Sequence, residues 1–389
     1  MAIGRTAQAL LLALGGLGAI LLWGVAFFNG TLINMNAVVT KHAFPDGRPL
    51  RSNYTGIQLL DKKIVYLVVF YEVLSNGAAL GPRLLFVDIN FLVVTVSIWM
   101  MVESRRRGMQ NIALRRPVFF MILWLGVGAA FIQPLYFCLH MRTKAAIRDP
   151  TVPYNESIAL FMAVLPSFLV PFLLFLPTWL GLDTIQHQGY ISLFFASPCL
   201  IVAAYFIGVL LLSPWHGLVS KKDMKRPNID KPWIIATLAL VGVLSAIVHV
   251  GCIAASLSSA SEDLSLGRLY LPSPGKMHSF TTDRKDSNAT LMPPHLVAYH
   301  VLVEGCHLFT QLDYAVVSAA CVIFTYSMLH GHEGDGMGTG MSMSASSFRQ
   351  LLLMVLGAFI FGPGAAGSWM LAAREDKLRK LAMNARKIQ

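Results

Sequence analysis

Charged residues are scarce in this chain. Asp, Glu, Lys and Arg make up 13% of its 389 residues, whereas hydrophobic residues make up 55%. The mean hydropathy is +0.60, and a soluble domain carries roughly 25% charged residues. This composition excludes an ordinary soluble enzyme and predicts a protein embedded in a lipid bilayer.

Cysteine is rare as well. The chain has five cysteines, all within apolar runs and none in a CxxC pair. Buried free thiols usually behave as small hydrophobic side chains. The sequence therefore predicts neither disulfides nor a zinc site.

Several catalytic signatures are missing. Without a DDxxD, NDxxD or DxDD motif we expect no carboxylate cluster that holds magnesium ions and ionises a prenyl diphosphate. Histidine boxes, a P-loop and a nucleophile elbow are also absent. Glu304 and His307 form an E-x-x-H pair, but a di-iron site needs a second such helix. His330, His332 and Glu333 fall in a Gly-, Ser- and Met-rich segment typical of a flexible loop. We expect no metal and no cofactor, which leaves acid–base chemistry or transport.

The net charge of +11 does not indicate a nucleic-acid partner. The basic residues lie in short loops between apolar runs, where they orient a membrane protein and contact lipid headgroups. Counting Lys and Arg on alternate loops favours a lumenal N-terminus and a cytosolic C-terminus, although the loop 214–232 disagrees. We expect a multi-pass protein of the endoplasmic reticulum.

The apolar runs predict the fold, because a span needs about 20 residues. They indicate an all-α polytopic helix bundle of eight or nine spans that forms one integral-membrane domain over 1–389. Residues 1–30 hold the first span or anchor, 258–294 an extramembrane loop, 330–347 a flexible loop and 373–389 a basic tail. The nine runs are 7–29, 64–81, 84–102, 117–141, 156–181, 190–213, 233–257, 295–329 and 348–372.

The run 295–329 contains polar residues inside an apolar helix. At about 100° per residue, six of them form one stripe and Asp313 lies on the opposite face. A charge at the bilayer centre costs at least about 2.5–3.5 kcal/mol, so we expect these groups to face protein or a wet cavity. Helix–helix hydrogen bonding is the alternative role. The stripe comprises His300, Glu304, His307, Gln311, Tyr314 and Ser318.

Other candidates lie elsewhere along the chain. Glu72 and Asp88 belong to the second and third runs. Asp183 and His187 stand four residues apart in the turn after the fifth run. That pair predicts the mouth of a substrate cavity, with helix capping by Asp183 as the alternative.

Five segments together resemble a family of fungal integral-membrane proteins from secondary-metabolite clusters. The family includes membrane terpene cyclases of the ascofuranone and ascochlorin type and membrane proteins of indole-diterpene clusters. Within the last segment Phe309, Gln311 and Asp313 match the family motif, whereas Thr310 and Leu312 depart from it. The segments are NYTGIQLLD (53–61), QPLYF (133–137), VLPSFLVPFLLFLPTWL (164–180), YLPSPG (270–275) and LFTQLDY (308–314).

The resemblance implies a cyclase that protonates an epoxide on a prenyl chain attached to an aromatic or polyketide unit. Such a reaction needs a neutral carboxylic acid, and burial among apolar side chains favours the neutral form of a carboxyl group. We rank Asp313 first as the acid, because the family motif contains it. Glu304 is the competing carboxyl or its partner, and His307 completes the catalytic set.

The remaining polar candidates are assigned to substrate binding. They are Gln311, Tyr314, His300, Asp183, His187, Glu72 and Asp88. The expected partners are a hydrophobic small molecule and the lipid bilayer. The competing hypothesis is a transporter or a lipid- or terpenoid-binding protein, in which the polar stripe lines a path. A transporter is typically built from pseudo-symmetric halves, and the sequence shows no such repeat.

Overall fold

A computed structural model describes residues 2–76, 80–143, 148–213, 228–273, 294–330 and 345–388. Within these ranges the regular structure is helical, and the β-structure is limited to an isolated bridge between Ala43 and Pro49. The all-α prediction is confirmed. Most of the two expected loops, at 258–294 and 330–347, lies outside the described residues.

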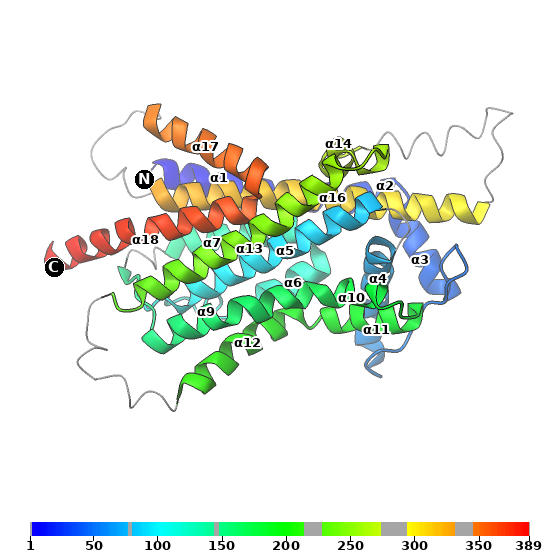
Figure 1. Ribbon diagram of the computed structural model, residues 1–389, viewed down its shortest axis with the longest axis horizontal. Coiled ribbons are helices and arrows are strands. Elements are labelled where there is room, and N and C mark those ends of the chain that lie inside the picture. The colour runs from blue at the N-terminus through cyan, green and yellow to red at the C-terminus, as the bar shows by residue number, and fades with distance from the viewer. Residues whose placement is uncertain are drawn as a thin grey trace.

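The long helices run along the long axis of the molecule (Figure 1). Five are long and apolar enough to cross a membrane, and a pair bent by 59° gives a sixth if it is one span. The five are Gly4–Phe28, Leu80–Arg105, Tyr154–Leu174, Lys231–Leu257 and Val297–His330, and the bent pair is Thr184–Phe194 with Ser197–Leu212.

The helix bounds follow the apolar runs. In chain order they are α1 (Ala2–Ala19), η1 (Ile20–Gly24), α2 (Val25–Phe28), α3 (Thr31–Lys41), α4 (Gln58–Ser75), α5 (Leu80–Arg105), α6 (Val118–Val127), α7 (Ala129–Thr143), α9 (Tyr154–Leu169), η2 (Val170–Leu174), α10 (Leu176–Trp179), α11 (Thr184–Phe194), α12 (Ser197–Leu212), α13 (Lys231–Leu257), η5 (Glu262–Leu264), α14 (Leu266–Tyr270), α16 (Pro294–His330), α17 (Ala345–Phe361) and α18 (Pro363–Ile388).

The expected span 117–141 is broken into a hairpin of α6 and α7. Gly128 has φ +100°, a conformation that glycine adopts at low cost. The segments before and after the hairpin lie side by side. The evidence is a hydrogen bond from the Arg107 N–H to Thr151 O (2.8 Å). The segment therefore enters and leaves the bundle at the same end.

The expected span 348–372 is broken in the same way at Gly362, which has φ +91°. The Tyr326 hydroxyl donates to Ser347 O (3.2 Å), so α17 starts beside the end of α16. Helix α18 then returns, and its Glu375 pairs with Arg106 just beyond α5. The expected basic tail is a continuation of α18 as far as Ile388.

Both chain ends consequently lie at one end of the molecule (Figure 1). The expectation had placed the two ends on opposite sides of the membrane. Three of the nine runs, at 64–81, 117–141 and 348–372, are not among the helices long and apolar enough to cross. The first corresponds to α4, and the other two form the hairpins.

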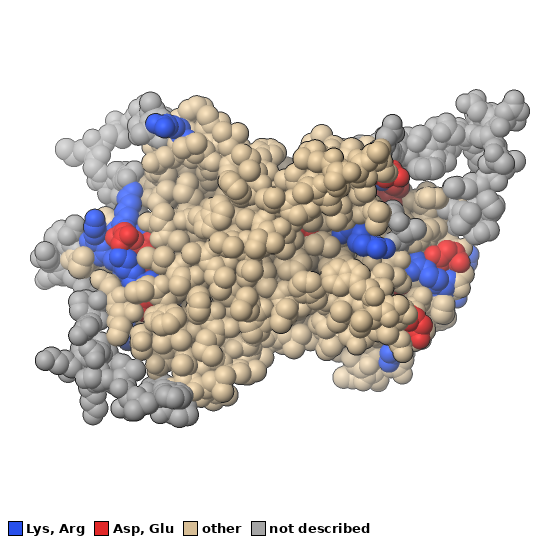
Figure 2. Space-filling view, in the orientation of Figure 1, with Lys and Arg blue, Asp and Glu red and all other residues tan. Residues whose placement is uncertain are grey.

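Charged side chains gather toward the two ends of the face shown in Figure 2, and the belt between them is almost uncharged. At the end that holds the termini, ion pairs are buried. Arg106 pairs with Glu103 (2.8 Å) and with Glu375 (2.5 Å), and Arg379 pairs with Asp230 (2.8 Å). Removing one partner of such a pair leaves an uncompensated charge, so the network fixes α18 against α5 and the start of α13.

This arrangement predicts which loops share a side of the membrane. Ser52 and Gln110 are both exposed, the first at the end with α3 and α4 and the second at the end with the termini. In sealed vesicles a membrane-impermeant maleimide should label only one of Ser52→Cys and Gln110→Cys, and the other only after detergent is added.

The parent protein, with Cys199 exposed, gives the background for this measurement. Equal labelling of both variants without detergent would contradict the hairpin arrangement.

Candidate functional site

The polar stripe of α16 holds the short helix α14. The His307 Nε2–H donates to Arg268 O (3.0 Å), and the Gln311 amide donates to Arg268 O (2.7 Å) and Leu271 O (3.0 Å). Glu304 forms an ion pair with the Arg268 side chain. The carbonyl oxygens in the last turn of a helix have no hydrogen-bond partner within that helix. In α14 such a partner is provided by His307 and Gln311 of the stripe.

The predicted catalytic set is therefore split. Glu304 and His307 contact α14, whereas Asp313 lies on another face of α16 and contacts α7. His300 stays on the stripe, partly exposed. A polar stripe on an apolar helix indicates polar partners, and here the partners of His307 and Gln311 are backbone carbonyls of α14 and the residue after it.

Glu72 and His187 form a buried pair. His187 Nδ1 lies 2.6 Å from one Glu72 oxygen, and Arg48 Nη1 and the Asn76 amide donate to the other at 3.0 and 2.7 Å. The second ring nitrogen donates to Leu174 O (2.9 Å). The cluster joins α4, α11 and the loop before α4 at one end of the bundle.

Asp183 is not part of that cluster. Its exposed side chain accepts a hydrogen bond from the Gln186 N–H (2.8 Å) and caps the N-terminus of α11. The structure supports the capping role and does not bring Asp183 and His187 together at a cavity mouth. Neither residue lines the aromatic cavity described below.

Asp88 pairs with a residue 161 positions away. Its Oδ2 lies 2.7 Å from His249 Nδ1 and accepts a hydrogen bond from the Tyr270 hydroxyl (2.9 Å). The Tyr314 hydroxyl approaches His249 Nδ1 (3.2 Å). The other ring nitrogen faces Phe359 O (3.2 Å), and it must carry hydrogen because a carbonyl only accepts.

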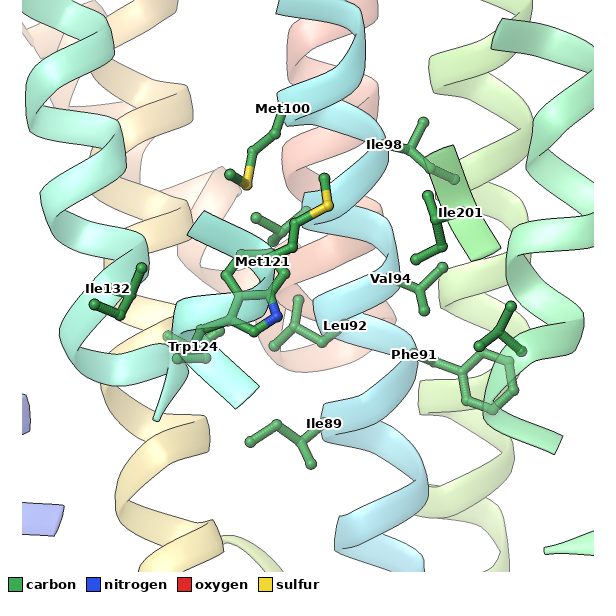
Figure 3. Close-up of a cluster of buried hydrophobic side chains, with 14 of the residues drawn as sticks. Ile89, Phe91, Leu92, Val94, Ile98, Met100, Met121, Trp124, Ile132 and Ile201 are labelled. Atoms are coloured by element: carbon green, nitrogen blue, oxygen red, sulfur yellow. The ribbon is translucent and has the colours of Figure 1, made fainter. Parts of the chain in front are cut away.

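Asp313 faces a separate cavity of about 70 Å³, which we call the aromatic cavity. Six aromatic side chains line it, together with Asn90 and Thr310. Figure 3 shows Met121 and Trp124 of α6 and Ile89 of α5, which are part of its wall. The aromatic lining consists of Phe70, Tyr71, Phe86, Trp124, Phe194 and Phe309.

The tip of the α6–α7 hairpin fixes the Asp313 carboxyl group. The Ala130 N–H, in the first turn of α7, donates to Asp313 Oδ1 (2.5 Å). On the other side of the break, the Trp23 indole donates to Val127 O (2.9 Å). First-turn N–H groups need an external acceptor, so a residue 183 positions away caps α7.

Sequence reasoning missed four neighbours of these carboxyl groups: Arg48, Asn90, His249 and Tyr270. Local spacing carries no signal for contacts across such long stretches of chain. Among the described residues, no three His, Cys, Asp or Glu side chains come together in a way that could hold a metal ion.

The segment 53–61 folds around Asp61. Its carboxylate accepts hydrogen bonds from the Thr55 N–H (2.8 Å), the Thr55 hydroxyl (2.8 Å) and the Gly56 N–H (3.1 Å). Desolvation alone would raise the pKa of Asp61, but these hydrogen bonds outweigh it and lower the pKa below its ordinary value.

The lowered pKa predicts a pH-dependent loop. The stabilisation is present above the unfolded-state pKa of about 3.9 and is lost as the pH falls through the lower folded-state pKa. The protection factors of the amides of residues 53–57, which correct for the pH dependence of intrinsic exchange, should therefore decrease on acidification below about pH 4. In Asp61→Asn the same amides should exchange faster at neutral pH and lose this pH dependence. A pH profile identical to the parent's would show that Asp61 does not hold the loop.

The two members of the expected pair at 183 and 187 should differ in their contribution to stability. His187→Ala leaves buried Glu72 with one partner fewer, and breaking a buried pair typically costs about 3–5 kcal/mol. Asp183→Ala removes only an exposed cap, at about 1 kcal/mol. Chemical unfolding in detergent should rank the variants in this order. Equal losses would mean that His187 is not a buried anchor.

Comparison of the sequence with known proteins identifies the family of this chain. The chain matches the CtvD domain over residues 6–379. It is 36% identical over 377 residues to terpene cyclase DEP1 of Fusarium langsethiae, covering 96% of this chain and 100% of that protein. It is 30% identical over 364 residues to terpene cyclase alnG of Emericella nidulans, covering 90% and 89%. Terpene cyclase ascI of Acremonium egyptiacum is 24% identical over 330 residues, covering 82% and 78%. No solved structure matches. The chain belongs to the CtvD-domain family of fungal terpene cyclases.

Proposed function

We propose that this terpene cyclase protonates an epoxide on the prenyl chain of a meroterpenoid, with Asp313 as the proton donor. The observation that carries the proposal is a carboxyl group placed in a cavity walled by six aromatic rings. An acid starts such a reaction, and aromatic faces attract the cation that follows.

The charge of the aromatic cavity favours an uncharged substrate. Among its described lining residues there is no Lys, Arg or His. Diphosphates are bound through such cations or through metal ions. An epoxide needs neither, because one proton on its oxygen is enough to weaken a C–O bond.

The chemical steps conserve atoms and charge. The Asp313 O–H bond breaks as the epoxide oxygen gains the proton, and the C–O bond to the more substituted carbon opens. A double bond of the prenyl chain attacks the resulting carbocation and closes a ring. The last cation loses a proton or is captured by a hydroxyl group of the substrate. The proton released returns to Asp313, so the product is an isomer of the substrate.

The hydrogen bond from the tip of the α6–α7 hairpin indicates which carboxyl oxygen of Asp313 can donate the proton. The Ala130 N–H donates to Oδ1, which suits the carbonyl oxygen of a neutral acid. The hydroxyl of that acid is then Oδ2, the oxygen that we assign to the epoxide. General acids require this kind of fixed geometry within hydrogen-bond reach.

The size of the cavity limits what it holds in this conformation. About 70 Å³ accommodates the epoxide end of a prenyl chain and not the whole molecule. We propose that the rest of the substrate extends past the short helix α6, whose Met121 and Trp124 close one wall.

We also propose that the protein crosses the endoplasmic reticulum membrane six times and carries two re-entrant hairpins. The uncharged belt (Figure 2) supports membrane embedding. Arg105, Arg115 and Arg374 belong to the same end as both termini. Cytoplasmic loops carry an excess of Lys and Arg, so we place that end in the cytosol.

Replacing Asp313 by Asn separates proton donation from capping. Asn still accepts the Ala130 N–H, since Asn and Asp cap equally well, but it has no acidic proton. General acid catalysis contributes typically about 10²–10⁴-fold. We therefore expect the Asn variant to fold and to lose at least about a hundredfold in rate. The assay follows conversion of an epoxidised prenyl phenol to a cyclised product of identical mass.

Glu304→Gln is the matched control. It removes a carboxyl group from the same helix, but one that pairs with Arg268 outside the aromatic cavity. Its rate per folded molecule should stay near the parental value. If Asp313→Asn cyclises at the parental rate, Asp313 is only a cap and the proposal is wrong.

A further inference from the structure

A second, much larger cavity lies on another side of α16. Its volume is about 710 Å³, and α13, α14, α16, α17 and the start of α18 form its walls. It shares no lining residue with the aromatic cavity. Small-molecule sites typically have volumes of roughly 300–1,000 Å³, so this cavity is large enough for a complete isoprenoid chain.

The lining of this cavity is apolar except on one wall. Aliphatic side chains of α16 and α17 cover most of it, including Val322, Ile323 and Val355. The polar groups are those of His249, Tyr270, Tyr314 and Ser318. No Lys or Arg is found among the described residues that line it.

The polar wall carries no net charge. His249 Nε2 holds a hydrogen toward Phe359 O, so a hydrogen bond between Nδ1 and Asp88 Oδ2, which lie 2.7 Å apart, requires a second proton on one of these two atoms. Imidazolium with carboxylate and imidazole with carboxylic acid have the same total charge of zero. A charged headgroup would therefore find no counter-ion here, whereas a hydroxyl group would find donors and acceptors.

Ser318 supplies an independent observation. Its Oγ is buried, and within the described part of the chain it has no hydrogen-bond partner. A buried hydroxyl without a hydrogen-bond partner is destabilising. Ser318 lines the cavity, so a rotation about χ1 would turn this hydroxyl toward a ligand oxygen.

The cavity also opens to the side of the bundle. Phe359 at its rim is 73% exposed and Leu271 is 65% exposed. Both are exposed apolar side chains, which suits entry of a ligand from the apolar phase.

We propose that this cavity binds one neutral isoprenoid that carries a hydroxyl group, with that group on Ser318 and the Tyr314 wall. The choice of an isoprenoid rests on the proposed function, since the family acts on terpenes. The site itself does not depend on Asp313. It holds a substrate or product molecule beside the catalytic helix.

The test uses full-length protein in lipid nanodiscs and a farnesol analogue with a photoreactive diazirine. Labelling should be saturable and should map to residues 315–323 of α16 and 355–359 of α17. Excess farnesol should displace the probe, and farnesyl diphosphate should not. Displacement by ergosterol at equal potency, unsaturable labelling or labelling confined to the aromatic cavity would overturn the proposal.

Two variants test the contacts. Ser318→Ala should weaken binding of the probe roughly threefold to tenfold, the size of one hydrogen bond. It should leave binding of the same probe without its hydroxyl group unchanged. Ala319→Phe, which fills the cavity, should abolish saturable labelling by both probes. Ser327→Ala is the matched control, because Ser327 lies on the same helix and lines neither cavity. Equal effects of Ser318→Ala on both probes would refute the hydroxyl contact.

Asp313→Asn distinguishes this proposal from the catalytic one. If the variant binds the probe normally and loses turnover, both proposals stand. Normal binding with parental turnover refutes only the role of Asp313 as the acid. Parental protein that turns over substrate but shows no saturable labelling refutes only the second site.

Discussion

Two helix breaks inside the bundle leave backbone groups that need partners away from water. In apolar surroundings each unsatisfied group costs several kcal/mol, so the sequence must provide polar side chains at that depth. At the Gly128 break Asp313 accepts the Ala130 N–H and Trp23 donates to Val127 O. At the Gly362 break His249 donates to Phe359 O. Asp313 and His249 are thus buried where the broken helices need polar partners.

The same breaks determine where ligands can bind. A hairpin that turns inside the bundle fills space less completely than an unbroken helix, and a cavity lies beside each tip. Both of these cavities therefore include a polar group that the backbone already requires. A side chain that caps a helix is held rigidly, and a rigid acid is what proton transfer needs. In Asp313 the structural role and the proposed catalytic role support each other.

The sequence was sufficient to predict an all-helical membrane-type fold, because composition is a local signal, whereas the ranking of Asp313 as the acid came from the resemblance to a family motif. It could not predict the hairpins, since Gly128 stands inside a run apolar enough to cross a membrane. The contacts of Glu304 and His307 with α14 could not be predicted, because α14 belongs to a segment expected to lie outside the membrane. The contact between Asp88 and His249 spans 161 positions and leaves no local pattern.

Helix α16 lies between the two cavities, and its residues determine how ligands in the two cavities are placed relative to each other. Asp313 lines one cavity and Tyr314 the other. Consecutive residues of a helix differ by about 100° in direction and by only about 1.5 Å in height. Both sites consequently lie at the same depth of the bundle. An isoprenoid held by Tyr314 and Ser318 is already at the level of the acid, and it reaches Asp313 by moving around α16 and not along the membrane normal. The apolar part of the molecule can then remain in apolar surroundings throughout, which avoids the desolvation changes that a path through either charged end would impose.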